Sequence, residues 1–153
     1  MEYDCGAYIN ILSNKVKSRL DSAISDFGIT GVQSRFIFYI LTHYKKAPVF
    51  QRDIENAYRI GRSTATGVLN LMEKNGLIVR QSVDTDARLK SLIPTKKAEE
   101  LNERVREILK ETDSILTRGL SDENIALFKE VAKKMILNLE ELEDSHKHGC
   151  RIE

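Results

Sequence analysis

Residues 51–94 contain the pattern that most restricts the fold of this chain. A short amphipathic segment, QRDIENAY, is followed by the tight link RIG, in which Gly61 can take a positive φ that other residues resist. A longer segment then places apolar side chains at helical spacing, at Ala65, Val68, Leu69 and Met72. It ends at an Asn-Gly pair, a signal for the end of a helix. Two extended runs, LIVRQSV and RLKSLIP, flank DTDA and predict a β-hairpin with a polar tip. This order predicts a winged helix-turn-helix.

Long amphipathic helices are expected on both sides of this region. Residues 8–27 repeat apolar side chains every three or four positions, and ITGVQSRFIFYILTHY is dense enough in apolar residues for a buried second helix. After the hairpin, Thr95 is a good N-cap for a helix that ends at Gly119, and Ser121 begins a last helix. We therefore expect a mainly α fold with about six helices and a β-hairpin wing.

The expected organisation is one chain unit over residues 1–153. The winged helix-turn-helix lobe is expected to span residues 30–97. The long helices of residues 1–27 and 98–145 each carry an apolar stripe that so small a lobe cannot cover, so they are expected to form a dimerisation region. The alternative is a monomer in which these helices close into an antiparallel bundle.

The N-terminal residues MEYDCGAYIN lack the basic start and apolar core of a secretory signal. The 2 cysteines, Cys5 and Cys150, lie near opposite ends, which is a poor disulfide framework. A cytoplasmic protein is therefore expected.

The net charge of +1 hides an uneven distribution along the chain. Residues 45–97 hold 11 basic and 5 acidic side chains, whereas residues 98–153 hold 9 basic and 14 acidic ones. A local basic surface attracts phosphate backbones whatever the total charge. The alternative is chance variation along the chain, but the basic region coincides with the predicted winged helix-turn-helix.

The exposed face of the second helix in the motif carries side chains that suit DNA bases. Arg bonds guanine, Asn bonds adenine, and Ser or Thr bonds bases or phosphates. The expected base-contact residues are Arg62, Ser63, Thr64, Thr66 and Asn70. Gly67 on this face costs roughly 1 kcal/mol relative to Ala inside a helix, which a close approach to DNA would justify. The alternative is a solvated polar face with a tolerated glycine.

Residues 29–98 resemble the MarR family of winged-helix transcription regulators. The resemblance is carried by Ser63-Thr64-Ala65-Thr66 at the start of the recognition helix, by MEKNGL at its end, and by Asp86-Ala87-Arg88 in the wing. The family often has Arg at the position of Ala87 and a basic residue at that of Gly67. Both departures bear on the strength or sequence preference of DNA binding and leave the expected fold unchanged.

The resemblance implies a homodimeric regulator, a repressor rather than an activator, that binds a pseudo-palindromic double-stranded DNA operator. It also implies that Arg88 enters the minor groove and that Asp86 orients it; a narrow minor groove attracts a guanidinium. The alternative is a plain surface ion pair. The expected phosphate contacts are Lys45, Lys46, Gln51, Arg52, Lys74, Arg80 and Lys90.

A small aromatic or phenolic effector is implied by the resemblance alone. Weak candidates for its pocket are Phe36, Tyr39, His43, Tyr44 and Tyr58, which are equally explained as core residues. Cys5 is a weak candidate for oxidant sensing, because the neighbouring Asp4 disfavours the thiolate that a sensor needs. His146, His148 and Cys150 do not follow a zinc-ligand spacing, and no metal or cofactor is expected.

No catalytic signature is present: the chain lacks a phosphate-binding Gly-x-x-x-x-Gly-Lys loop, a Gly-x-Ser-x-Gly elbow and a His-Glu-x-x-His pair. An enzyme is therefore not expected. The alternative function is a winged-helix protein-interaction module without specific DNA binding. The salt dependence of duplex binding separates the two, since each neutralised phosphate releases counterions.

Overall fold

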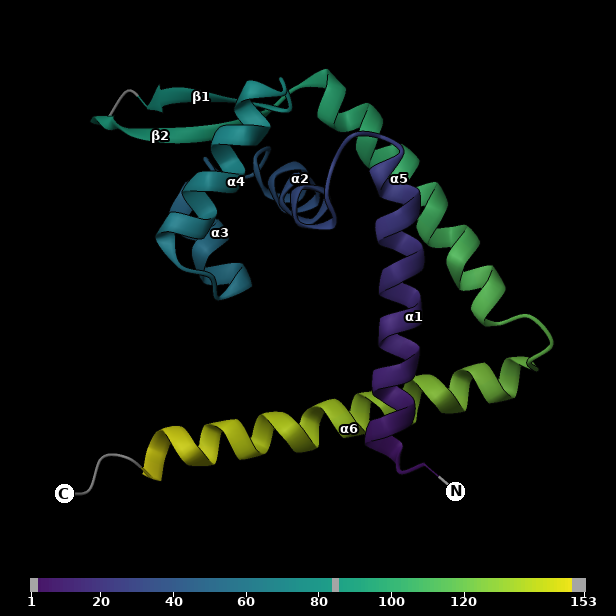
Figure 1. Cartoon of the computed structure of the whole chain (residues 1–153). Helices are drawn as coiled ribbons and strands as arrows, with labels where there is room; N and C mark the ends of the chain where they lie inside the picture. Colours follow the sequence, from purple (N-terminus) through teal and green to yellow (C-terminus); the bar gives the residue numbers. More distant parts are fainter. Residues whose placement is uncertain (1–2, 84–85, 150–153) are drawn as a thin grey trace. The chain divides into compact units, whose positions relative to one another are not determined.

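The structure is a computed structural model that describes residues 3–83 and 86–149, with side chains at residues 3–83 and 89–141. The described residues form six helices and one two-stranded antiparallel sheet (Figure 1). The elements are α1 (Cys5–Ser25), α2 (Gly31–His43), α3 (Gln51–Tyr58), α4 (Arg62–Lys74), β1 (Ile78–Val83), β2 (Asp86–Pro94), α5 (Lys96–Leu116) and α6 (Asp122–Gly149). The predicted fold, mainly α with a hairpin after the second helix of the motif, is confirmed.

Hydrogen bonds at the helix starts explain several boundaries. The carboxylate of Asp4 accepts a hydrogen bond from the Ala7 amide at 2.7 Å, so α1 begins at Cys5, three residues before the expected start. At α2, the Thr30 hydroxyl accepts from the Gln33 amide, and the Gln33 side chain accepts from the Thr30 amide. This reciprocal pair is a capping box and fixes the entry into α2.

The hairpin follows α4 directly and is tied to the segment that precedes α3. Strands β1 and β2 pair from Ile78 opposite Pro94 to Val83 opposite Asp86, with an irregularity between Ser82 and Val83. The Leu92 amide also donates to the Val49 carbonyl at 2.7 Å. The wing is therefore attached on both sides of the helix-turn-helix, which limits how far it can move relative to α4.

The structure divides into two compact units, residues 1–112 and 113–153. In the first unit the core lies between α2, α3, α4, the hairpin and the first half of α5. Its largest fully buried side chains are Phe36, Ile37, Ile40, Ile54, Leu69, Met72, Leu77, Ile78 and Leu92. Burying side chains of this size stabilises the fold by roughly 1.5–3 kcal/mol each before entropy is counted. The recognition helix therefore stands on a packed core.

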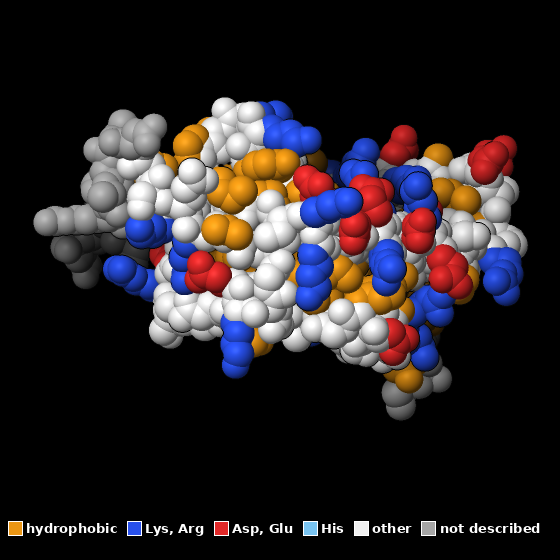
Figure 2. Space-filling model, turned by 90° about the horizontal axis from the view of Figure 1, so that it is seen from above, with side chains coloured by type: hydrophobic (Ala, Val, Ile, Leu, Met, Phe, Trp, Pro, Cys, Tyr) orange, Lys and Arg blue, Asp and Glu red, His pale blue; other side chains and the backbone are white. Residues whose placement is uncertain are grey.

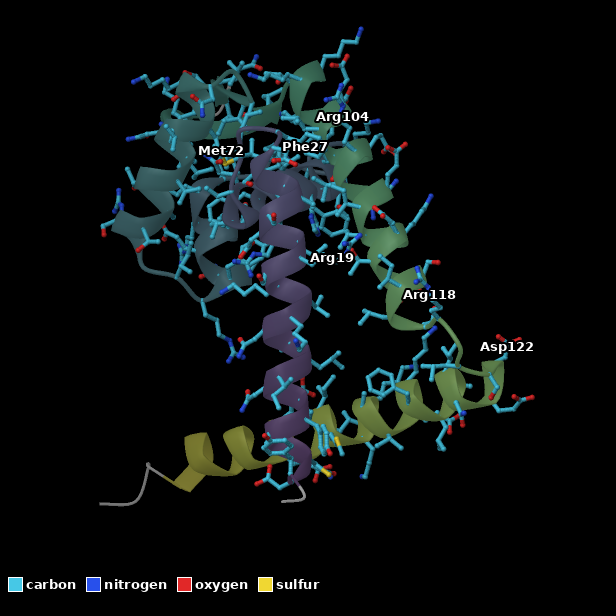
Figure 3. The ribbon with its side chains drawn as sticks, turned by 45° about the vertical axis from the view of Figure 1, so that its right-hand side comes forward. Arg19, Phe27, Met72, Arg104, Arg118 and Asp122 are labelled. Carbon is cyan, nitrogen blue, oxygen red and sulfur yellow. The ribbon has the colours of Figure 1, made fainter. Side chains whose placement is uncertain are left out.

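Within the first unit, two arginines join α5 to α1 and to the turn that follows α1 (Figure 3). Arg19 on α1 donates to the Thr112 hydroxyl at 3.3 Å and pairs with Glu111 at 3.1 Å. Nearer the lobe, the guanidinium of Arg104 lies 5.6 Å from the ring centroid of Phe27, a cation–π contact. The second unit holds the end of α5 and α6.

Two expectations about single residues are wrong. Gly61 has φ −70° and is the N-cap of α4, whereas Arg59 takes the left-handed conformation, with φ 50°. The link turns at Arg59 because its amide and that of Ile60 bond back to the end of α3. The amphipathic pattern of QRDIENAY predicts that Ala57 faces inward with Ile54 and Tyr58, but Ala57 is exposed. None of the described helices is long and apolar enough to cross a membrane.

Candidate nucleic-acid interface

Helix α4 has the two contrasting faces that its sequence predicts. Ala65, Leu69 and Met72 are fully buried. On the other side Ser63, Asn70 and other polar residues are exposed. Because the buried face anchors the helix in the core, the polar face is held in a fixed orientation toward solvent.

The N-terminal end of α4 favours anions. Arg62, Ser63 and Thr64 are exposed there, and the first turn contains no acidic residue. The amide groups of a helix N-terminus and the positive end of its dipole attract phosphate oxygens. Expected base-contact residues therefore lie where a phosphate backbone would also be stabilised.

The hydroxyl of Thr66 links α4 to α3. It accepts a hydrogen bond from the side-chain amide of Gln51 at 2.8 Å and donates to the Arg62 carbonyl at 2.8 Å. Gln51 also donates to the Glu55 carboxylate at 2.8 Å. The hydroxyl proton of Thr66 is thus used inside the protein, and what it can offer a base is its methyl group and an acceptor lone pair.

A second network joins α4 to β1. Arg80 Nη1 donates to Asn70 Oδ1 at 2.7 Å and lies 3.0 Å from Glu73 Oε2. The Arg80 amide also donates to Glu73 Oε1 at 3.3 Å. The expected phosphate contact Arg80 and the expected base contact Asn70 are therefore brought together, with the positive charge of Arg80 facing a carboxylate.

The remaining expected phosphate contacts lie on several elements of the first unit. Lys45 and Lys46 follow α2, Arg52 lies on α3 and Lys74 ends α4, all exposed. The ammonium of Lys90 on β2 donates to the hydroxyl of Ser82. On the face seen from above in Figure 2, Lys and Arg side chains lie among acidic, polar and exposed hydrophobic side chains.

The wing signature falls at the start of β2. The backbone of Asp86, Ala87 and Arg88 belongs to that strand, while their side chains lie outside the described residues. The expected roles of Arg88 and Asp86 stay predictions.

Four of the five expected effector residues, Phe36, Tyr39, His43 and Tyr58, form an aromatic cluster. Phe36 and Tyr58 stack with centroids 5.3 Å apart, Tyr39 stacks on His43 at 4.2 Å, and the Tyr44 hydroxyl donates to Glu99 at 3.3 Å. Phe36 is buried in the core. Burial raises the pKa of the Tyr58 hydroxyl, an effect that Arg35 opposes and Tyr39 reinforces. The Tyr58 hydroxyl donates to the Arg35 carbonyl at 2.7 Å.

One weaker candidate, Cys5, lies away from this surface. Cys5 is an exposed free thiol in the first turn of α1, at the end of that helix far from the hairpin (Figure 1). The side chains of His146, His148 and Cys150 lie outside the described residues. Among the described side chains, no group of three or more His, Cys, Asp or Glu is placed to hold a metal.

Two residues of this surface were missed from sequence. Glu73 binds Arg80 across the turn at Gly76, seven residues away, and only the opposite charges hinted at it. Arg59 takes the left-handed conformation, and no local signal marks a non-glycine residue for that role. Both depend on how elements meet, which a pattern within one element does not encode.

Known proteins place this architecture in one family. The model of the MarR family matches residues 27–89. The transcription regulator MarR from Oenococcus oeni is 34% identical, with 87% of this chain and 98% of that chain covered and a TM-score of 0.64. MepR of S. aureus in a DNA complex is 26% identical, with 90% and 99% covered and a TM-score of 0.77. MepR described as a regulator of the Staphylococcus aureus multidrug efflux pump MepA is 25% identical, with the same coverage and a TM-score of 0.78. This chain covers almost the whole of the O. oeni MarR chain at the identity given above, and it has the winged helix-turn-helix. It therefore belongs to the MarR family of transcription regulators.

Proposed function

We propose that this chain binds a pseudo-palindromic double-stranded DNA operator as a homodimer in the cytoplasm and acts as a repressor. The polar face of α4 reads bases in the major groove, and Arg88, oriented by Asp86, enters the adjacent minor groove. The surrounding lysines and arginines contact phosphates. DNA recognition, and not catalysis, is the activity.

The observation that carries this proposal is the exposed polar face of α4 on a helix anchored by fully buried residues. Arg62, Ser63 and Asn70 all lie on it. The N-terminal half of such a helix is the part that enters the groove in this motif. The S. aureus MepR chain, which was solved in a complex with DNA, matches 90% of this chain, and this supports DNA binding by this chain.

Self-association is supported by apolar side chains that the described chain leaves in solvent. On α1 they are Tyr8, Ile9, Ile11 and Leu12. On α6 they are Leu127, Phe128, Val131, Ile136, Leu137 and Leu139. Large apolar side chains exposed in this number mark association surfaces. A two-fold dimer would present two recognition helices to successive major grooves, about 34 Å apart.

An aromatic or phenolic effector that favours a different half-site spacing would release the DNA by shifting the population of dimer conformations. The Tyr39, His43 and Tyr58 rings support this part of the proposal. Phe36 is packed in the core, so a ligand would meet the outer rings, Tyr39 and His43.

Arg88→Ala tests the wing. Loss of one guanidinium contact to DNA should weaken binding to the preferred duplex by about 1.5–3 kcal/mol, the size of a hydrogen bond to a charged group. Fluorescence anisotropy across a salt series measures it, on a duplex that the wild-type chain selects from a randomised library. The midpoint of thermal unfolding should stay unchanged, because the substitution lies in the wing.

The matched control is Arg106→Ala, which removes the same charge from the exposed surface of α5. There Arg106 Nη1 forms an ion pair with Glu103 Oε1 at 3.4 Å. The substitution should leave affinity nearly unchanged. Equal effects of the two substitutions would contradict the wing assignment. A wild-type chain whose duplex binding is weak and insensitive to salt would favour the protein-interaction module instead.

A further inference from the structure

We propose that Glu73 is a positioning residue for base recognition: through Arg80 it fixes the side-chain amide of Asn70 in one orientation. This inference rests on the proposed function, since it concerns how α4 reads DNA. It adds a residue, Glu73, that does not itself face a base, and it assigns Arg80 a role other than phosphate contact.

The first step is the identity of the atom that faces Arg80. The two branches of an Asn amide look alike by shape alone, so their assignment depends on hydrogen-bond partners. A guanidinium only donates hydrogen bonds. Arg80 Nη1 lies 2.7 Å from the amide of Asn70, so the branch that faces it must be the oxygen. The NH₂ group then occupies the other branch of the same planar amide.

The second step is what holds Arg80. Both carboxylate oxygens of Glu73 bind it: Oε2 contacts the guanidinium at 3.0 Å, and Oε1 accepts from the Arg80 backbone amide at 3.3 Å. The Arg80 side chain is only 22% exposed. A partly buried ion pair that also holds the backbone restricts both the rotamer of Arg80 and the approach of β1 to α4.

The third step is the consequence for DNA. Asn70 is exposed on the face of α4 that carries the other candidates. If the side-chain amide of an Asn can rotate by 180°, its NH₂ donor and its carbonyl acceptor exchange places. Such an Asn distinguishes poorly between base pairs. An Asn held by a donor-only partner presents one order, which matches one pattern of major-groove donors and acceptors. Glu73 and Arg80 therefore add selectivity at a single base-pair position.

The same network removes Arg80 from the phosphate contacts. Its charge is compensated by Glu73, so it should add little to the number of counterions released on binding. Glu73→Gln keeps the size of the side chain and an acceptor oxygen but removes the charge. The freed Arg80 should then make the salt dependence of duplex binding steeper by about one phosphate.

The experiment uses the full chain and a duplex that the wild type selects from a randomised library. Each position of that duplex is then replaced in turn by all four base pairs, and the affinity for each resulting duplex is measured. Asn70→Ala should lower the preference at one position about tenfold. Glu73→Ala should lower it at the same position, and should have no further effect on that preference when Asn70 is already Ala. That lack of additivity marks action through Asn70.

Substitutions of Arg80 separate positioning from stability. Arg80→Lys keeps a donor-only side chain and should retain most of the preference. In Arg80→Gln the new side chain can donate or accept a hydrogen bond, so it no longer holds the Asn70 amide in one orientation. The base-pair preference should then fall as in Asn70→Ala. Thermal unfolding of each variant reports stability independently. If Glu73→Ala does not fold, the Arg80 variants carry the same test.

Glu100→Gln is the matched control for charge, because Glu100 lies on α5 and pairs only loosely, at 4.0 Å, with Lys96. It should change neither the preference nor the salt dependence by as much as Glu73→Gln. The inference is overturned if Glu73→Ala weakens all duplexes equally, acts at another position, or adds fully to Asn70→Ala. A wild-type chain that selects no duplex at all overturns the proposed function itself, and that outcome is visible before any variant is made.

Discussion

Gly67 is the residue of α4 whose presence is hardest to explain from the protein alone. A Cβ built at this position meets nothing within 4 Å, so packing does not require a glycine. A glycine in a helix interior costs about 0.5–1 kcal/mol relative to alanine. The explanation we favour is a close approach of the recognition helix to DNA.

Gly67→Ala and Gly76→Ala form a matched pair that separates backbone from contact effects. Neither new methyl group meets an atom within 4 Å, but Gly76 has φ +69° and Gly67 has a helical backbone. Gly67→Ala should raise the free energy of unfolding by about 0.5–1 kcal/mol. Gly76→Ala should lower it by about 1–2 kcal/mol, the cost of a left-handed conformation. Chemical denaturation measures both.

The same two variants test the explanation of Gly67. If the helix approaches DNA closely, Gly67→Ala should weaken duplex binding even though it stabilises the fold. A more stable protein with unchanged affinity would refute the close approach. If Gly76→Ala weakens duplex binding and Gly67→Ala does not, the cause is a general loss of folded protein, which the denaturation curve would reveal.

At single residues, sequence reasoning succeeded where burial follows a helical period and was incomplete where side chains pair across elements. The buried and exposed faces of α4 were predicted correctly. Sequence did not reveal that Thr66 is bonded to Gln51, or Asn70 to Arg80, because these contacts depend on the distance between α3, α4 and β1. The left-handed turn was assigned to Gly61 on propensity, but it occurs at Arg59, where hydrogen bonds to the end of α3 outweigh the propensity.

Among the elements, the junction of α2 and α3 depends on a tyrosine. The hydroxyl of Tyr58 on α3 donates to the Arg35 carbonyl on α2, and its ring stacks on Phe36. Burial raises the pKa of this hydroxyl, with smaller opposing and reinforcing effects of Arg35 and Tyr39. The neutral phenol is therefore favoured in the folded protein.

Tyr58→Phe should destabilise the chain at pH 7 by about 0.5–1.5 kcal/mol, the net value of one hydrogen bond. Because the folded pKa lies above the unfolded value, the folded state holds its proton more tightly, and this stabilisation is complete below the unfolded pKa near 10. It is lost as the pH rises from there through the folded pKa. The stability difference between wild type and Tyr58→Phe should therefore shrink above about pH 10.

Denaturation curves over a pH series measure this difference, and subtraction removes the titration of the other tyrosines. Tyr3→Phe is the control, because Tyr3 is 53% exposed and precedes α1. Its difference from wild type should be small. A constant difference for Tyr58→Phe would show that the phenol does not contribute to the alkaline loss of stability.

Element identities were predictable because each has its own signal: a period of three to four residues, a cap, or a turn. The extent of burial was less predictable. Leu109, Ile115 and Leu116 belong to the apolar stripe expected on α5, yet each is well exposed in the described chain. A hydrophobic period indicates that a face needs a partner and does not indicate whether the same chain supplies it.

At the scale of the whole molecule, exposed apolar side chains on α1, α5 and α6 are the main feature that one chain leaves unexplained. Leu139 on α6 is 64% exposed and Phe128 is 60% exposed. Side chains of this size on consecutive turns of one helix are costly to leave in water. A second copy of the chain would cover them, and the proposed operator, with two half-sites, requires such a pair.

Leu139→Glu should therefore shift the chain from dimer to monomer, because burying an unpaired carboxylate in an apolar interface is strongly unfavourable. Sedimentation equilibrium measures the shift. Asn138→Glu is the matched control: it adds the same carboxylate at the neighbouring exposed position without removing an apolar side chain. Circular dichroism should show unchanged helix content for both.

Binding to the selected duplex should fall with the loss of the dimer, by about 100-fold or more, because the second recognition helix no longer binds at a high effective concentration. The winged lobe is not altered, so weak binding of the monomer that does not depend on sequence should persist, with a smaller salt dependence than that of the dimer. If Leu139→Glu remains dimeric, α6 is not the interface. If it is monomeric and still binds the duplex as tightly as wild type, two recognition helices are not needed, and the model of a symmetric operator fails even though the face of α4 still reads DNA.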